Sequence, residues 1–260
     1  MNDTITKCRI CDNTDLIDII KLGEQKITSR FPLKGEGSSV PVTNIDICLC
    51  NKCSLVQLRQ TTFASELYEH EYGYMSSISN TMRQHLKDYN REVLTKISLN
   101  DNDVVVDIGS NDATTLKLYD SSIRRIGVDP TGKQFEKYYD GIELLSDYFT
   151  KENFIKNFGD TKCKIVTSIS MFYDLPDPVK FAKDIHDVLD DDGIWSCEQS
   201  YLLSMLDTNS LDTICHEHLE YYSLTAIKNI ADKANLKIID IKFNSCNGGS
   251  FRLWINVTKN

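Results

Sequence analysis

The amino-acid sequence predicts an α/β fold in which a seven-stranded, mostly parallel sheet follows a small cysteine-rich lobe. From residue 102 onward, short apolar runs alternate with helical stretches, as parallel strands and their crossover helices do. Near the start, two C-x-x-C pairs flank a long loop, and near the end a glycine-containing turn joins two apolar runs. We therefore expect a lobe over residues 1–60, a helical lid or linker over 61–101 and a sheet domain over 102–260.

The composition of the whole chain favours a cytoplasmic protein that acts on small molecules. With 260 residues, of which 41% are hydrophobic and 26% charged, the chain can bury one large core and an appendage. It contains no apolar run as long as a membrane span, and its polar beginning, MNDTITKCRICDN, lacks the core of a signal peptide. The net charge of -9 and the lack of a basic cluster disfavour RNA or DNA as a substrate, because phosphates need a positive patch.

The lobe contains two C-x-x-C knuckles, Cys8–Cys11 and Cys50–Cys53. Four thiolates in such pairs suit a closed tetrahedral zinc site, which can hold together a segment too small to have much of a core. The alternative is four free buried thiols. Because four sulfurs leave no open position on the metal, the site is expected to be structural rather than catalytic. The total of nine cysteines is odd, which argues against a disulfide framework.

The segment that follows the lobe is rich in tyrosines and hydroxyls. It contains Tyr72, Tyr74, Ser76 and Ser77, which can line a polar pocket for a hydroxylated ligand. The alternative is a loop that caps the next predicted helix, Asn80–Lys96.

The sheet domain opens with a predicted strand–turn–helix–strand unit. The strand, Asp103 to Ile108, stops at Gly109, and polar residues up to Asp112 can cap a helix over Thr114–Tyr119. A second strand, Arg125 to Val128, ends in Asp129. This acid lies about 20 residues beyond the glycine, where nucleotide-binding units place a carboxylate on the ribose hydroxyls. The alternative is that Asp129 only caps a helix.

The glycine pattern excludes the usual dinucleotide fingerprint. Gly109 is followed by Ser110-Asn111-Asp112-Ala113, which is not G-x-G-x-x-G and leaves no backbone nest for a pyrophosphate. A nucleoside without phosphates still needs the tight turn and the ribose-binding acid. The unit therefore favours a nucleoside cofactor of this kind.

The remaining strands complete the predicted sheet. They are expected at Ile142–Leu145, Lys164–Ser168, Gly193–Glu198, Leu236–Phe243 and Ser250–Val257, with a helix over Pro178–Leu189 and an antiparallel hairpin at the edge. Ligands of such sheets lie at the carboxyl ends of the strands. We therefore expect one cleft around Asp107, Gly109, Asn111, Asp129, Ser168 and Glu198.

A catalytic candidate is the run Cys215-His216-Glu217-His218. A histidine near neutrality can remove a proton from an acceptor, and Glu217 or the neighbouring histidine can orient it. Two other interpretations are polar surface residues and a second metal site made of Cys215, His216 and His218. The spacing is not H-E-x-x-H, so a metalloprotease is disfavoured.

Several motifs together carry a family resemblance. DIGSND followed by GVDP resembles the motifs of S-adenosylmethionine (SAM)-dependent methyltransferases. With the C-x-x-C pairs, CNKCSLVQL, YGYMSSISNTMRQH, CHEHLEYYS and GGSFR, the whole chain resembles the zinc-containing sugar methyltransferases. The best-known members of that family are C-methyltransferases of nucleotide-linked keto-deoxysugars.

The resemblance implies a class I methyltransferase, Rossmann-like fold, with SAM and zinc as cofactors and a nucleotide-sugar as substrate. It implies that residues 72–79 form a lid over cofactor and sugar, that Asp147 and Phe149 contact adenine, and that His218 is the base, supported by Glu217. Glu198 and Tyr222 are then expected at the sugar.

The chain departs from the family pattern at Cys215, where the familiar enzymes have a tyrosine, and at Ala113, where they have a glycine. It also stops before their further C-terminal domain. Losing the phenol weakens stabilisation of an enolate, whereas a hydroxyl acceptor needs only a base and alignment. The sequence therefore favours O-methylation of an activated sugar, with C-methylation as the close alternative. An inactive SAM-binding module and a zinc-bearing RNA methyltransferase are further alternatives, the last opposed by the acidic charge.

Overall fold

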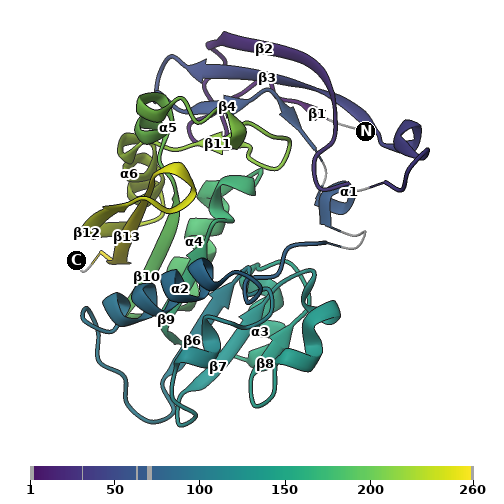
Figure 1. Ribbon diagram of the computed structural model, residues 1–260. Coiled ribbons are helices and arrows are strands. Elements are labelled where there is room, and N and C mark those ends of the chain that lie inside the picture. Colours follow the sequence, from purple (N-terminus) through teal and green to yellow (C-terminus); the bar gives the residue numbers. More distant parts are fainter. Residues whose placement is uncertain (1–2, 31, 63, 69–71, 259–260) are drawn as a thin grey trace.

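The computed structural model describes residues 3–30, 32–62, 64–68 and 72–258. Over these residues the chain forms a seven-stranded sheet with helices on both faces and, at one end of the molecule, a second sheet of four strands (Figure 1). Residues 1–2 and 31 of the predicted lobe, 63 and 69–71 of the predicted lid, and 259–260 lie outside the described residues.

The large sheet has the strand order β12-β13-β10-β9-β6-β7-β8, which confirms the seven predicted strands. Strands β6 to β10 pair in parallel, and β13 is antiparallel to both of its neighbours, so the predicted hairpin at the sheet edge is also confirmed. The strands are β6 (Val104–Ile108), β7 (Arg124–Val128), β8 (Glu143–Leu145), β9 (Cys163–Ile169), β10 (Leu189–Ser200), β12 (Leu236–Asn244) and β13 (Ser250–Val257).

The crossover between β6 and β7 differs from the prediction. Over Thr114–Tyr119 the chain makes only the short 3-10 turn η2 (Leu116–Leu118) instead of an α-helix. Ala113 has a left-handed φ of 59°, and the Asp112 carboxylate accepts hydrogen bonds from the Thr114 N–H at 3.3 Å and its hydroxyl at 2.5 Å. This side-chain turn competes with helical hydrogen bonding, and the few residues left before β7 cannot form a helix of useful length.

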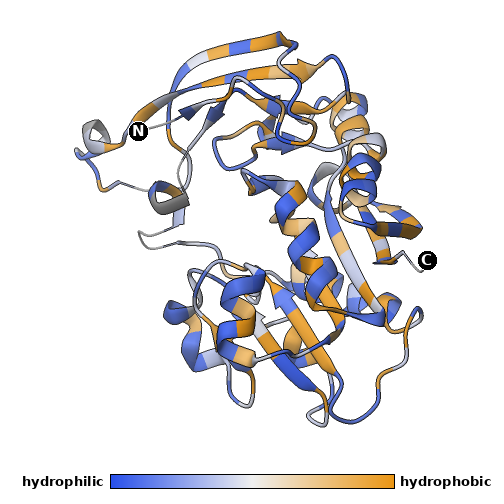
Figure 2. Ribbon diagram, turned by 180° about the vertical axis from the view of Figure 1, so that it is seen from behind, coloured by the Kyte–Doolittle hydropathy of each residue, from blue (hydrophilic) through white to orange (hydrophobic). Residues whose placement is uncertain are grey.

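Helices pack on both faces of the large sheet. Alternate residues of β6 point to opposite faces, so Val105 packs near α2 (Asn80–Val93), whereas Val106 belongs to the core beneath α4 (Pro178–Val188). Helices α3 (Lys151–Phe158) and α6 (Leu224–Lys233) lie on the α4 face, and Figure 2 shows hydrophobic residues along the strands that these helices cover. No helix in the described part of the chain is long and apolar enough to cross a membrane.

The small sheet joins both halves of the chain. Its order is β11-β4-β3-β2, with β2 (Leu16–Lys26), β3 (Val42–Cys50) and β4 (Val56–Leu58) from the predicted lobe. Strand β11 (Glu220–Tyr221) comes from the C-terminal half and pairs antiparallel with β4. The lobe is therefore built from more than residues 1–60, because β11 returns to complete its sheet.

The remaining elements are short and lie mostly in the connections. They are β1 (Asp3–Thr4), η1 (Gly37–Ser39), β5 (Gln60–Thr61), α1 (Ala64–Tyr68), η3 (Gly132–Tyr138), η4 (Phe172–Asp174), α5 (Leu202–Thr208), η5 (Leu211–Thr213) and η6 (Cys246–Gly248).

Candidate active site

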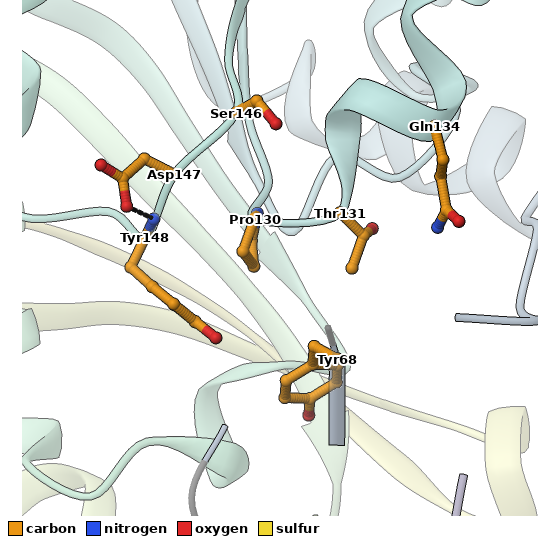
Figure 3. Close-up of a pocket in the computed structure, with 7 residues that line it drawn as sticks. All are labelled: Tyr68, Pro130, Thr131, Gln134, Ser146, Asp147 and Tyr148. Carbon is orange, nitrogen blue, oxygen red and sulfur yellow. Dashed lines mark hydrogen bonds between the residues drawn. The ribbon is translucent and has the colours of Figure 1, made fainter. Parts of the chain in front are cut away.

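A cavity of about 340 Å³ opens at the carboxyl ends of β7 and β8. It is lined by Tyr68, Pro130, Thr131, Gln134, Ser146, Asp147 and Tyr148 (Figure 3). The strand order reverses between β6 and β9, and open α/β sheets bind their ligands at such a switch point. The volume lies at the low end of the range for small-molecule sites.

The loop after β6 has the geometry of a nucleoside-binding turn. Gly109 has φ of 74°, and an added Cβ there would lie only 3.0 Å from the Met171 Cγ, so this position needs glycine. The Asp129 carboxylate accepts hydrogen bonds from the Asn111 N–H at 2.8 Å and from the Thr131 N–H at 2.7 Å. The Oδ1 atom also accepts a hydrogen bond from the Thr131 hydroxyl at 2.6 Å, so Oδ2 is the oxygen that can accept a further hydrogen bond from a ribose hydroxyl.

The side chains of the same loop hold the predicted lid. Asn111 accepts a hydrogen bond from the Ser76 N–H at 3.0 Å and donates one to the Tyr74 carbonyl at 3.0 Å, and Asp112 accepts one from the Ser77 N–H at 3.0 Å. These contacts involve lid backbone, so the sequence of the lid can vary without losing them. The Asn111 side chain therefore positions the lid, a role that its predicted cofactor contact did not include.

Two other predicted cofactor contacts, Asp107 and Ser168, lie deeper than the cavity wall. Asp107 is buried and accepts a hydrogen bond from the Thr167 hydroxyl at 2.6 Å, and burial raises its pKa to about 7. Ser168 is fully buried and its hydroxyl accepts a hydrogen bond from the Trp195 indole at 2.9 Å, which gives it a place within the sheet.

The predicted aromatic contact is displaced by one residue. Phe149 is buried in the core, with its ring 5.5 Å from that of Phe181 and 6.1 Å from that of Phe154. The side chain that reaches the cavity is that of Tyr148, next to Asp147. Alternation along the chain explains the difference, since consecutive extended residues point to opposite sides.

The run Cys215–His218 lies just before β11, where the two sheets meet. His216 is buried: its Nδ1 accepts a hydrogen bond from the Thr28 N–H at 3.3 Å, and its Nε2 contacts the Thr43 carbonyl at 3.4 Å. Both ring nitrogens of His216 thus contact backbone groups of the N-terminal lobe, so this side chain has a structural role. The Glu217 carboxylate accepts a hydrogen bond from the Ser29 hydroxyl.

The hydrogen bonding of His218 leaves one of its ring nitrogens able to accept a proton. Its Nδ1 lies 2.7 Å from the Thr213 carbonyl, which can only accept, so Nδ1 carries the proton and Nε2 carries the lone pair. The ring is half-buried and lies 4.3 Å, centroid to centroid, from that of Tyr173. Burial lowers the pKa of His218 below its ordinary value, so the imidazole is neutral at neutral pH.

Sequence reasoning missed an acid close to this run, Asp174 at the end of η4. Its Oδ2 accepts a hydrogen bond from the Tyr68 hydroxyl at 3.1 Å, and its buried Oδ1 has no hydrogen-bond partner among the described residues. Burial, and next the Glu217 charge, raise the pKa of Asp174 well above its usual range. The Tyr72 ring lies 5.4 Å from the Tyr68 ring. Burial first, and then the charges of Asp174 and Glu217, raise the pKa of Tyr72. The feature of the sequence that could have indicated Asp174 is its position a few residues after the end of β9, at the carboxyl edge of the sheet.

Two predicted substrate contacts are also placed inside the protein. Tyr222 is buried, and its ring stacks on that of Phe172 at 5.3 Å. Glu198 is 1% exposed and accepts hydrogen bonds from the Arg252 Nε at 2.7 Å and from Asn244 at 2.9 Å. Tyr74, by contrast, is 47% exposed, and Ser76 and Ser77 are half-buried, so these lid residues are accessible to a ligand.

The four predicted zinc ligands come together in the lobe. The Cys8 and Cys53 sulfurs are 3.4 Å apart, those of Cys11 and Cys50 are 3.5 Å apart, and all four lie within 4.8 Å of one another. Four mostly buried thiols with this spacing fit a closed tetrahedral zinc ion. Cys48 lies outside this set, as predicted.

Comparison with known proteins identifies the domains. Residues 82–241, more than half of the chain, match the family described as "Methyltransferase domain". The chain belongs to this methyltransferase family. Residues 8–68 match the family described as "Putative zinc binding domain", in agreement with the four clustered cysteines. The chain is thus a SAM-dependent methyltransferase with a zinc-binding lobe, as the resemblance implied.

Individual proteins agree with this family. The C-methyltransferase NovU of Streptomyces niveus is 27% identical over 252 residues, which are 95% of this chain and 59% of the relative. The chain therefore spans about three fifths of that relative's length. An S-adenosylmethionine-dependent methyltransferase from Clostridium acetobutylicum ATCC 824 has a similar fold, with a TM-score of 0.55 and 11% identity over 68% of this chain and 92% of that one. The PH0226 protein from Pyrococcus horikoshii OT3 gives a TM-score of 0.57 and 14% identity over 75% of this chain and 100% of that one.

Proposed function

We propose that this methyltransferase acts on a nucleotide-activated sugar and that His218 removes a proton from the acceptor atom. The observation that carries the proposal is the tautomer of His218: the Thr213 carbonyl holds the Nδ1 proton, so that Nε2 can accept another. The neighbouring Asp174, Tyr68 and the lid residues supply the polar groups that a hydroxylated ligand requires.

The cofactor is expected to lie along the carboxyl ends of β6, β7 and β8. Asp129 would hold the ribose hydroxyls, Gly109 would allow close approach of the backbone, and Asp147 and Tyr148 would border the adenine. Bound SAM supplies a methyl group on a positively charged sulfur. The lid, held by Asn111 and Asp112, would exclude water and align acceptor and methyl.

Replacing Asp129 by asparagine is expected to weaken SAM binding about 10-fold or more. The variant keeps the size of the side chain, but it replaces one acceptor oxygen by an NH2 donor, and it loses the charge that strengthens a hydrogen bond from a ribose hydroxyl, an effect of about 1.5–3 kcal/mol. Isothermal titration with SAM measures it. Asp120→Asn, which changes an acid on an exposed turn between η2 and β7, is the matched control. Equal affinity of both variants and the unaltered protein would contradict the ribose assignment.

Carbon is the first candidate for the acceptor atom. A phenol to replace the missing tyrosine at position 215 is available from Tyr72, because burial raises the pKa of Tyr72 and keeps its hydroxyl protonated, whereas the Tyr68 hydroxyl donates its proton to Asp174. A protonated phenol, or the Asp174 carboxyl in its neutral form, can donate a hydrogen bond to the oxygen of an enolate. The name of the 27% identical relative, a C-methyltransferase, supports the same choice.

A sugar hydroxyl, which the sequence favoured over carbon, is the second candidate. It is favoured by Cys215, whose thiol replaces the tyrosine of the resembling enzymes, and by the fact that a neutral His218 suffices for an O–H proton.

Incubation with SAM and a panel of nucleotide-sugars distinguishes the two. The panel contains keto-deoxysugars and fully hydroxylated hexoses and heptoses, and mass spectrometry and NMR read the products. A methyl group on carbon, confined to keto-sugars, is the expected result. A methyl group on oxygen would establish the second candidate. Binding of SAM with no product from any sugar would instead favour an inactive module.

A further inference from the structure

The loop after β6 and the lid meet at one residue, Asn111. Its backbone N–H donates a hydrogen bond to the Asp129 Oδ2 at 2.8 Å. Its side-chain carboxamide accepts a hydrogen bond from the Ser76 N–H and donates one to the Tyr74 carbonyl, both at 3.0 Å. Asn111 is only 5% exposed, so water competes little for these bonds. One buried residue therefore contacts both the acid proposed to bind ribose and the lid.

The backbone conformation of Asn111 restricts which residue type can make these contacts. Its φ of 48° lies in the left-handed region, where asparagine is enriched among residues that have a side chain. A carboxamide has both a donor and an acceptor, whereas an aspartate carboxylate only accepts and glycine has no side chain. Asparagine therefore satisfies the backbone and both lid contacts at once.

The lid has little regular structure of its own to hold it. The described residues 72–79 contain no helix or strand, so their backbone groups are not part of a ladder. Besides the contacts of Asn111, the Ser77 N–H donates a hydrogen bond to Asp112 at 3.0 Å, and Gln134 donates one to the Tyr72 carbonyl at 3.3 Å. Asp112 belongs to the loop after β6, and Gln134 lies on the cavity wall (Figure 3). A segment held in this way opens at a low cost in free energy, so its position depends on the loop.

The loop in turn depends on Asp129. Gly109, Asn111 and Ala113 all have left-handed φ angles, and for the two residues with side chains such angles persist only where the surroundings fix them. The Asp129 carboxylate fixes the backbone of Asn111, and its Oδ2 can accept one more hydrogen bond. A ribose hydroxyl at Oδ2 would hold this carboxylate in place. Cofactor binding is therefore expected to stabilise the loop conformation that presents the carboxamide to the lid.

We propose that Asn111 is a positioning residue that couples cofactor binding to the lid, so that the acceptor site is completed only after SAM has bound. SAM at Asp129 fixes Asn111, and Asn111 fixes the lid. The inference rests on the proposed function for the positions of SAM and of the acceptor. Because coupling between two binding events is reciprocal, the acceptor binds more tightly to the SAM complex than to the free protein, and SAM binds more tightly in the presence of the acceptor.

Hydrogen exchange of the zinc-loaded protein, with and without saturating SAM, tests the coupling. The Ser76 and Ser77 N–H groups are themselves the donors in the lid contacts, so their exchange reports opening of the lid directly. We expect SAM to slow exchange in the peptide that contains them by about 10-fold, within the usual range of coupling between sites. Isothermal titration with SAM establishes that the protein is saturated.

Variants of Asn111 separate the coupling from a general effect of the cofactor. Asn111→Gly keeps the left-handed backbone but removes both lid contacts, so SAM should no longer slow exchange in this peptide. Asn111→Asp keeps the acceptor for Ser76 but loses the donor to Tyr74, so an intermediate effect of SAM is expected. Asn209→Gly is the matched control, because Asn209 has φ of 53° on an exposed turn after α5, and this variant should keep the full effect of SAM.

The possible failures of the coupling and of the proposed function give different results. Equal exchange of the lid peptide with and without SAM, in the saturated unaltered protein, would overturn the coupling even if no variant of Asn111 folded. A full effect of SAM in folded Asn111→Gly would overturn it as well. An unweakened affinity of Asp129→Asn for SAM would instead overturn the placement of the cofactor, and the coupling with it.

Discussion

Replacing His218 by alanine is expected to slow methyl transfer by about 10²-fold or more while leaving the affinity for SAM unchanged. The variant removes the Nε2 lone pair that would take the acceptor proton, and general-base catalysis is worth about 10²–10⁴-fold. None of the hydrogen bonds around Asp129 involves His218, so cofactor binding should persist. Single-turnover rates and isothermal titration measure the two effects.

The pH dependence gives an independent reading of the same role. The base form of His218 is the neutral imidazole, and burial lowers its pKa below the ordinary value of 6.5. Activity should therefore persist as pH falls to 6.5 and decline only below it, as the imidazole becomes protonated. His216→Ala is an instructive comparison, because it removes contacts with Thr28 and Thr43 and should reduce stability without moving this limb of the profile. Unchanged turnover of folded His218→Ala would refute the base assignment.

The strands of the sheet were predictable because their signals are local. Each combines a short apolar run with a polar or glycine stop, and the carboxyl ends of such strands meet at one edge whatever the connections do. The helix predicted over Thr114–Tyr119 shows where such local signals are insufficient. A side-chain turn at Asp112 and the left-handed backbone of Ala113 take its place, and no glycine or proline marks either of them in the sequence.

The residues of the candidate site also divide into those with a local sequence signal and those without one. Asp129 follows a strand and could be placed by counting, whereas Tyr68 and Asp174 acquire their partners only through tertiary packing. Ser168, Phe149 and Tyr222 were expected at the cleft because sequence shows position along a strand but does not show which side chain faces inward. Residues from the two sheets meet at the run 215–218, and no spacing rule predicts such a junction.

The zinc lobe is connected to the proposed base through Arg9, which lies between the knuckle ligands Cys8 and Cys11. Its guanidinium donates hydrogen bonds to the Leu58 carbonyl at 2.7 Å and the Leu219 carbonyl at 3.4 Å, and pairs with the buried Glu220 at 3.6 Å. Leu219 follows His218 and donates a backbone hydrogen bond to the Tyr173 carbonyl at 2.8 Å. The four-cysteine site is therefore linked through Arg9 to the segment that carries the proposed base.

Removing zinc is accordingly expected to lower methyl transfer by about 10²-fold, because a displacement of about 1 Å at a positioned group can cost that much. Cys53→Ser, or dialysis against a strong chelator, removes the metal. Atomic absorption, limited proteolysis of the N-terminal lobe and turnover follow the effect. The affinity for SAM should change far less, since the cavity at β7 and β8 has no residue from the knuckles.

Cys48→Ala is the matched control, because Cys48 lies on the same strand as Cys50 and is fully buried but does not belong to the four-cysteine cluster. It should retain one zinc per chain and lose some stability through the small cavity left, with turnover nearly unchanged. Full turnover in a metal-free protein would show that the lobe does not position His218. Equal losses of turnover and of SAM affinity would show general unfolding instead, so only a selective loss of turnover supports the connection through Arg9.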